Sequence, residues 1–175
     1  MKTSLDRLSG DLDQLRGQGI RRVFIDTPPA ATETIRGIVG HADLVVIPTR
    51  PSPHDLRAVG GTLDVVEALN RPLIFVVNGA TPRARITAQA ATALSQHGTV
   101  APTTVHQRVD FAVSMIDGRT VMELNPNSRA AAEVAALWQY LSARLGKLER
   151  RHLRLPFVGR DRRLAGPVFG RRVRT

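Results

Sequence analysis

Three short polar segments follow apolar runs in the sequence, and each of them could do chemistry. They are Asp26-Thr27-Pro28-Pro29, Pro48-Thr49-Arg50 and Asn78-Gly79-Ala80. Parallel α/β sheets bind ligands at the carboxyl ends of their strands, so these segments are the candidate site residues. Asp26 is the foremost candidate, because a carboxylate at the end of an apolar strand is costly to bury without a partner. Mg²⁺ or its water shell would supply that partner, and a helix cap or an arginine is the plainer alternative.

Hydrophobic patterning predicts the elements that must position these segments. Apolar runs that do not alternate predict buried strands at residues 23–26, 43–48 and 72–78, with a further strand around 99–105. Helical spacing predicts helices at 3–17, 32–40, 53–69 and 82–97, and a last helix that ends at 148. Strands that alternate with helices indicate right-handed crossovers. We therefore predict an α/β fold with an open, mostly parallel sheet and helices on both faces.

Two of the predicted helices have recognisable starts. Ser52 can cap the helix at 53–69, where Pro53 suits the first helical position and Asp55 stands where a capping box places an acid. Asn127 or Ser128 can cap the last helix. Its expected core face consists of apolar residues at helical spacing: Val134, Leu137, Trp138, Leu141, Leu145 and Leu148.

Charge is unevenly distributed along the 175 residues. The formal net charge is +10, of which residues 150–175 contribute +8 through nine arginines and one acid. We therefore expect an α/β domain at residues 1–149 and a flexible, arginine-rich basic tail at 150–175. No cysteine is present, which excludes disulfides and thiolate chemistry. No apolar run is long enough to span a bilayer and no signal core is found, so a cytoplasmic location is expected.

Other catalytic patterns are missing from the sequence. The five histidines are scattered without metal-ligand spacing. The motifs of a serine nucleophile and of a dinucleotide-binding loop do not occur.

Four segments, taken together, resemble one known family. Val23-Phe24-Ile25-Asp26-Thr27-Pro28-Pro29 resembles the Walker B and switch II segment of the ParA/MinD family of deviant Walker-type P-loop ATPases. Residues 42–52 resemble the strand and loop that follow it, and Phe75-Val76-Val77-Asn78 resembles the strand whose asparagine touches adenine. Residues 117–123 resemble the C-terminal part of the family. The likeness covers residues 20–145 in matching order.

The resemblance implies a role for each matching residue. Asp26 would hold Mg²⁺, through a bound water, and Thr27, Pro28 and the residues up to Ala30 would form the loop that senses the γ-phosphate of ATP. Asn78 would hydrogen-bond the adenine edge, with Pro82 near the base; a turn residue before a glycine is the plainer interpretation of Asn78. Many relatives have glycine where this chain has Ala30, which would stiffen the switch.

The sequence departs from the family at the phosphate site. The family's nucleotide site needs a glycine-rich loop with Lys and Ser/Thr, and the only lysines here, Lys2 and Lys147, do not follow such a loop. The helix at 3–17 matches the element that precedes Walker B. We therefore expect the family's first strand, Walker A loop, first helix and second strand to be missing, so that Mg-ATP binds weakly or not at all and ATP is not hydrolysed.

The basic tail has three interpretations. The first is DNA binding through phosphates, which is non-specific and salt-dependent; the residues selected are Arg150, Arg151, Arg154, Arg162, Arg163, Arg171 and Arg172. The second is a solvated extension. The third is an anionic membrane surface, against which the glycines and prolines of the tail argue.

We interpret the chain as a ParA-like protein of plasmid partition, chromosome segregation or cargo positioning. The resemblance implies, for the complete form, an ATP-dependent homodimer on DNA and a partner protein that stimulates hydrolysis. The alternative is a non-enzymatic module that binds nucleic acid or a partner. A gene fragment without a stable fold is the third possibility.

Overall fold

The computed structural model describes residues 3–27 and 33–154, with side chains up to Arg150. Its helices lie in the order α1 to α7, and most match the predicted ranges within a few residues. They are α1 (Leu5–Gly17), α2 (Glu33–His41), α3 (Pro53–Ala68), α4 (Arg85–Ser95), α5 (Val109–Ser114), α6 (Val121–Leu124) and α7 (Arg129–Arg154).

The described strands form one parallel sheet with β2 at its centre. Strand β1 (Val45–Thr49) lies along one side of β2 (Leu73–Ala80), and β3 (Thr99–Val100) and β4 (Val105–His106) lie along the other. Every pairing is parallel, with Val45 opposite Leu73 and Asn78 opposite Val105. The predicted α/β class and the parallel sheet are therefore confirmed.

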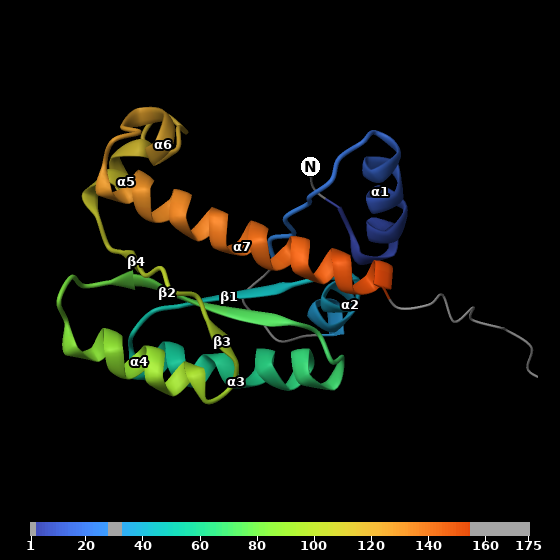
Figure 1. Ribbon diagram of the computed structural model, residues 1–175, viewed down its shortest axis with the longest axis horizontal. Coiled ribbons are helices and arrows are strands. Elements are labelled where there is room, and N and C mark those ends of the chain that lie inside the picture. The colour runs from blue at the N-terminus through green and yellow to red at the C-terminus, as the bar shows by residue number, and fades with distance from the viewer. Residues whose placement is uncertain (1–2, 28–32, 155–175) are drawn as a thin grey trace, which may run out of the picture.

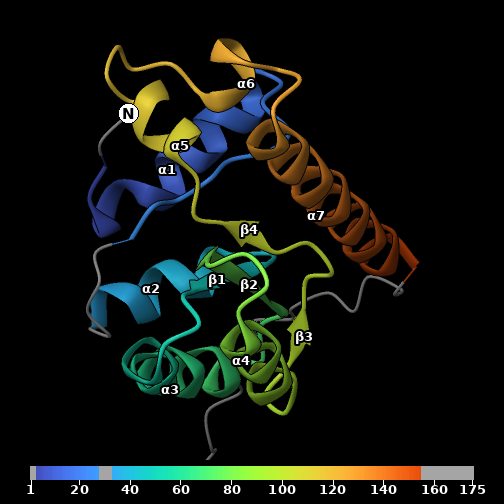
Figure 2. The same ribbon diagram turned by 90° about the vertical axis from the view of Figure 1, so that its left-hand side faces the viewer.

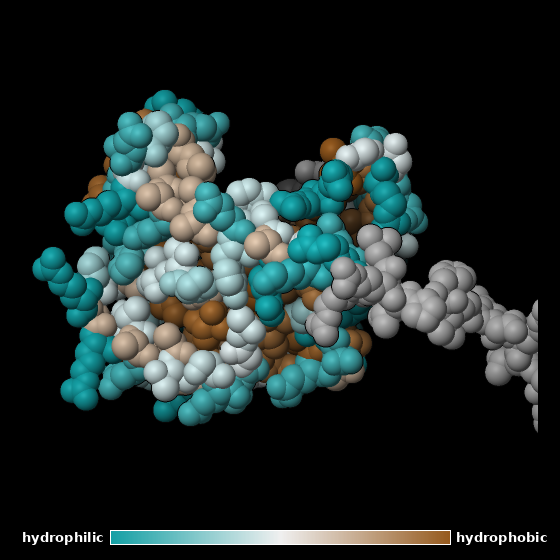
Figure 3. All heavy atoms as spheres, viewed as in Figure 1, coloured by the Kyte–Doolittle hydropathy of each residue, from teal (hydrophilic) through white to brown (hydrophobic). Residues whose placement is uncertain are grey.

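Successive side chains of β2 enter two separate cores. Phe75 and Val77 pack with Leu63 under α3 and α4, whereas Ile74 and Val76 pack with Leu141 of α7 on the opposite face. Figures 1 and 2 show α3 and α4 on one side of the sheet and α7 on the other. Figure 3 shows hydrophobic residues gathered between these layers, with hydrophilic ones around them. A strand covered on both faces is apolar throughout, which explains the run 73–77.

Side-chain caps start α3 and α7 at the predicted residues. The Ser52 hydroxyl accepts a hydrogen bond of 3.2 Å from the backbone N–H of Asp55, and Pro53 occupies the first turn. The Ser128 hydroxyl accepts one of 3.1 Å from the N–H of Ala131. A cap that the sequence analysis did not select joins Thr120 and Glu123 at α6, where each side chain bonds the other's backbone N–H.

The prediction of a buried strand at residues 23–26 was wrong. This segment has no strand pairing, and the side chains of Val23 and Phe24 are 44% and 72% exposed. No described strand lies beside it to bond its backbone, and an apolar run becomes a strand only where such a partner exists. Asp26 consequently does not end a strand of this sheet.

The strand expected around 99–105 is interrupted. Its two ends pair with β2 as β3 and β4, and between them the backbone N–H of Ala101 still bonds the carbonyl of Phe75 at 2.8 Å. The register shifts between Asn78 and Ala80. Residues 102–104 therefore form an irregular stretch between β3 and β4, and the pairing of β4 with β2 is itself irregular.

The last helix is longer and less buried than predicted. It continues to Arg154, beyond the expected end at Leu148. Trp138, which we expected in the core, is 41% exposed, whereas Leu141 one turn later is 7% exposed. The apolar stripe of α7 is thus narrower than its sequence indicates. Within the described residues, no helix is long and apolar enough to cross a membrane.

Pro48 lies in β1 without removing an internal hydrogen bond. The backbone N–H of Val45 points to β2, where it bonds the carbonyl of Pro72 at 2.9 Å. Backbone groups alternate in direction along a strand, so position 48 faces away from β2. Its missing N–H therefore lies on the side of β1 that no described strand covers.

Candidate functional site

The parallel register brings two of the three predicted polar segments together. Thr49 is opposite Val77, so Arg50 follows β1 at the level where Asn78 and Gly79 occur in β2. The Arg50 side chain passes so close to Gly79 that an added Cβ would lie 3.5 Å from its Nε. Gly79 also has a φ of +63°, which L side chains rarely adopt. This end of the sheet is the candidate site.

Asn78 and Pro82 both lie at this end of the sheet. Asn78 is half-buried in β2, and among the described residues its side chain has no hydrogen-bond partner. Pro82 is exposed in the turn that leads to α4, where Arg83 has a φ of +63°. Asn78 is therefore free to bond a ligand, and its role in base binding stays a prediction.

Asp26 and Thr27 lie outside the sheet. Both side chains are exposed, and within residues 3–27 and 33–154 Asp26 forms no ion pair. The plainer interpretation of Asp26, a pairing with arginine, is thus not observed in the described part of the chain. Pro28 and the rest of the expected switch loop, residues 28–32, fall outside the described residues.

The predicted nucleic-acid residues are described only in part. Arg150 is exposed near the end of α7. Arg151 and Arg154 continue the helix, and their side chains are not described. Arg162, Arg163, Arg171 and Arg172 fall outside the described residues. The predicted binding by these arginines stays a prediction.

A side-chain network beyond β4 was missed by the sequence analysis. The Glu133 carboxylate of α7 accepts hydrogen bonds from Arg108 Nη2 at 2.6 Å and Nε at 3.3 Å. The same carboxylate bonds the backbone N–H of His106 at 3.1 Å and its ring Nδ1 at 2.8 Å. These residues join the end of β4 and the start of α5 to α7. The sequence did contain one signal for this network, because Glu133 is the single acid among the apolar and small residues 130–135.

The environment of Glu133 has two opposing effects on its acidity. Burial by itself would raise its pKa, but the hydrogen bonds from Arg108 and His106 outweigh burial and lower the pKa to about 2. Glu133 is therefore a carboxylate at neutral pH. Because its oxygens already accept four hydrogen bonds, its role in the described structure is to hold elements together.

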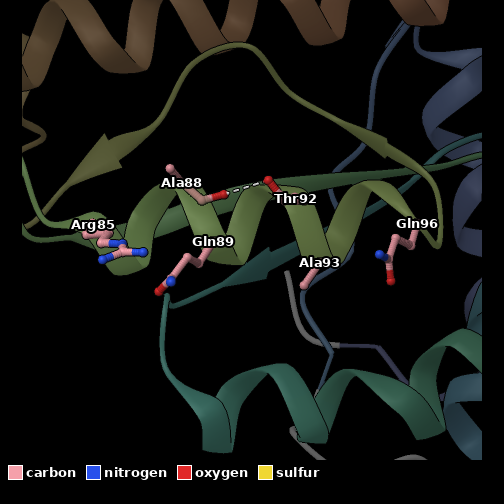
Figure 4. A pocket seen from close by; sticks show the side chains of 6 residues that line it. All are labelled: Arg85, Ala88, Gln89, Thr92, Ala93 and Gln96. Carbon is pink, nitrogen blue, oxygen red and sulfur yellow. Dashed lines mark hydrogen bonds between the residues drawn. The ribbon is translucent and has the colours of Figure 1, made fainter.

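The surface of α4 carries a shallow hollow that no prediction anticipated. Figure 4 shows its lining, which comes from α4 and the residue that follows it: Arg85, Ala88, Gln89, Thr92, Ala93 and Gln96. Thr92 uses its hydroxyl to bond the carbonyl of Ala88 at 3.0 Å, so it is not free for a ligand. The hollow adds no reactive group to the candidate site.

The described residues do not by themselves fit Mg-ATP. They hold no cluster of three acidic or histidine side chains that could ligate a metal. The whole sequence has no glycine-rich loop with lysine to cradle phosphates. Asn78, for which base binding is predicted, and the exposed carboxylate of Asp26 are present, but the sequence has no phosphate-binding loop to accompany them.

Comparison with known proteins finds similarity both in sequence and in fold. The sequence is 28% identical over 118 residues to the maintenance of carboxysome distribution protein A of Halothiobacillus neapolitanus, a match that covers 63% of this chain and 55% of that protein. The fold matches the cell division ATPase MinD of Pyrococcus furiosus with a TM-score of 0.66 and 14% identity, covering 79% of this chain and 58% of MinD. No model of a protein family matches the sequence.

The chain thus spans little more than half the length of either protein. The first match supports relationship in sequence, and the second shows a shared fold. Both lie within the family that residues 20–145 resemble. The resemblance to the ParA/MinD family is therefore confirmed: the chain is similar in sequence to one such protein and shares the α/β fold of the P-loop ATPase MinD.

Proposed function

We propose that this chain is a ParA-like positioning protein that acts on DNA and whose 175 residues, taken alone, do not hydrolyse ATP. The observation that carries the proposal is the match to a protein of carboxysome distribution, combined with the MinD fold. Positioning of a cargo is the common theme of that relative's name and of the family resemblance. DNA partition is the finer version of the proposal, supported by the net charge of +8 on residues 150–175.

The proposed ATP site uses the residues at the end of β2. Asn78 would bond the adenine edge near Pro82, and Asp26 would bind Mg²⁺ through water beside Thr27 and Pro28. In the complete form, ATP would hold two copies together and a partition partner would stimulate hydrolysis. Asn78 has no side-chain hydrogen bond among the described residues, which supports its part in this proposal.

ATP turnover tests the first half of the proposal. The folded 175-residue protein is mixed with Mg-ATP and phosphate release is measured, with Asp26→Ala as the comparison. The expected result is no release above background, because backbone donors and a loop lysine supply most of the charge neutralisation in this class. Mg-dependent turnover that Asp26→Ala abolishes would overturn it.

Salt-dependent DNA binding tests the second half. Replacing Arg150, Arg151 and Arg154 by Gln is expected to weaken binding to duplex DNA and to flatten its salt dependence by roughly 0.9 per arginine on a log–log plot. Arg83 and Arg85 lie in and after the turn that follows β2, and their replacement by Gln is the matched control. Equal effects of both sets would refute a specific role for the basic segment.

Asp26 is exposed and forms no ion pair within residues 3–27 and 33–154, which also favours a second candidate, a non-enzymatic module that binds nucleic acid or a partner. In that case Asp26→Ala changes neither nucleotide binding nor DNA binding. Equilibrium binding of a fluorescent ATP analogue, with and without Mg²⁺, separates the two candidates. Binding that depends on Asn78 and Asp26 supports the ParA-like site.

A further inference from the structure

An exposed aromatic pair joins two distant parts of the chain. The ring of Phe24, in the segment before residue 28, lies 5.9 Å from the ring of Trp138 on α7, with the planes tilted by 45°. This spacing is typical of a favourable aromatic contact. The two rings are 72% and 41% exposed, so the contact leaves much of both ring surfaces open to solvent.

A fixed cation stands beside this pair. The guanidinium carbon of Arg22 lies 5.1 Å from the Trp138 ring centroid, and its Nη1 donates a 2.9 Å hydrogen bond to Ser142 Oγ one turn further along α7. Arg21 is exposed next to it. In the described part of the chain, neither arginine forms an ion pair. Arg22 therefore holds a positive charge, with no acidic partner among the described residues, beside open aromatic surface.

The chemistry of this surface fits one class of ligand. A ligand that offers a flat ring and a negative charge satisfies both features at once, and a nucleotide unit has both. Stacking requires a base whose face is free. Duplex DNA keeps its bases stacked on one another, whereas a single strand presents them separately. Charge complementarity and open rings together favour the single strand.

We propose that Phe24, Trp138 and Arg22 form a stacking site for single-stranded nucleic acid. The site binds without base sequence preference, because every base has a flat face. The inference deepens the nucleic-acid binding proposed above and names the strand form that this surface accepts. It concerns residues other than the basic segment 150–175, so the two can be tested apart.

The single tryptophan of the sequence gives a direct measurement. Trp138 fluorescence is followed during titration with a twelve-residue thymidine oligonucleotide, with an equal mass of blunt duplex DNA, and with ATP. The expected result is strong quenching by the single strand and weak quenching by the duplex. Quenching by ATP at the same concentration of nucleotide units would instead identify a mononucleotide site and overturn the proposal.

Variants separate stacking from folding. Phe24→Ala is expected to weaken binding of the single strand roughly five- to hundredfold, and Phe24→Tyr to retain it, because the ring supplies the contact. Arg22→Gln is expected to lower the salt slope by about 0.7, whereas Arg85→Gln on α4 leaves it unchanged. Ile86→Ala, a 40% exposed residue of α4, is the apolar control. Circular dichroism confirms that each variant is folded.

The outcomes distinguish this inference from the proposed function. Duplex binding through the basic segment with no quenching of Trp138 by the single strand refutes the stacking site and leaves the proposed DNA binding in place. Quenching that survives replacement of Arg150, Arg151 and Arg154 supports an independent stacking site. A third outcome is a shift of Trp138 emission with protein concentration alone, together with self-association in sedimentation that Phe24→Ala abolishes. This outcome means that a second copy covers the rings, and it also refutes the stacking site.

Discussion

Arg108 and Glu133 form a two-pronged ion pair across 25 residues of sequence, with Nη2 to Oε1 at 2.6 Å and Nε to Oε2 at 3.3 Å. Their side chains are only 20% and 15% exposed. Arg108 directly precedes α5, and Glu133 lies in the first turns of α7. The pair therefore determines where α5 stands relative to the long helix, and His106 extends the link to the sheet.

Glu133→Ala is expected to destabilise the fold by about 1–3 kcal/mol, because it leaves Arg108 and the His106 N–H without their acceptor. Urea unfolding measures the change. Glu149→Ala, an exposed glutamate on the same helix, should change the free energy of unfolding by less than about 0.5 kcal/mol. Equal losses in the two variants would show that the network contributes nothing specific.

Acid should weaken the folded state through the same carboxylate. Hydrogen bonds lower the pKa of Glu133 from 4.5 to about 2 in the folded chain. A depressed folded pKa contributes stability that is complete above the unfolded pKa and is lost as the pH falls from about 5 towards 2. Thermal unfolding at a series of pH values should show this loss, and Glu133→Gln should remove that part of the slope. An unchanged slope in the variant would contradict the assignment.

Burial on the α7 face of the sheet can be tested with one type of substitution at two positions, because Val46 is opposite Ile74 and points to the same face as Val76. Val76→Ala removes two buried methyl groups from the core under α7 and should cost about 1.5–3 kcal/mol. Val46→Ala removes the same groups from the neighbouring strand, where the side chain is 36% exposed, and should cost much less. Denaturant midpoints measure both. A larger loss at position 46 would mean that β1 is buried in solution by something beyond the described residues.

The cap of α3 gives a further prediction. Ser52→Ala removes the acceptor of the Asp55 N–H and should destabilise the protein by about 0.5–2 kcal/mol. Ser9→Ala, at an exposed site inside α1, should be neutral or slightly stabilising, since alanine is the better helix former. Thermal melting compares the two variants. A cap with no energetic effect would leave the two midpoints equal.

Local patterning was sufficient to predict β1, β2 and the helices that cover them. Residues 73–77 are apolar throughout because both faces of β2 are covered, and Ser52 and Ser128 cap helices by contacts within three residues. Partners distant in sequence could not be predicted in the same way. Phe24 belongs to an apolar run beside which no described strand lies, and Arg108 contacts Glu133 only after the chain has folded.

The same contrast between local pattern and distant partners holds for the residues of the candidate site. Asn78 was predicted from its place at the end of an apolar run, and β2 indeed positions it beside Arg50 and Gly79. Asp26 was predicted from the same kind of run but lies outside the sheet. The prediction failed because an apolar run in the sequence does not show which strands pair with one another. The resemblance deduced from motif order is supported by the comparisons, although one of the predicted strands is not formed in the described structure.

Pro48 leaves a missing N–H on the edge of β1 that faces away from β2, and this gap hinders the pairing of a further strand. A foreign strand that approached this margin would meet a carbonyl at position 48 but no hydrogen to bind, so the incoming ladder would be broken at its middle. Among the described residues this edge of β1 is unpaired, and the proline makes it a poor template for the addition of a further strand. The proline thus hinders strand addition at this edge without removing a hydrogen bond between β1 and β2.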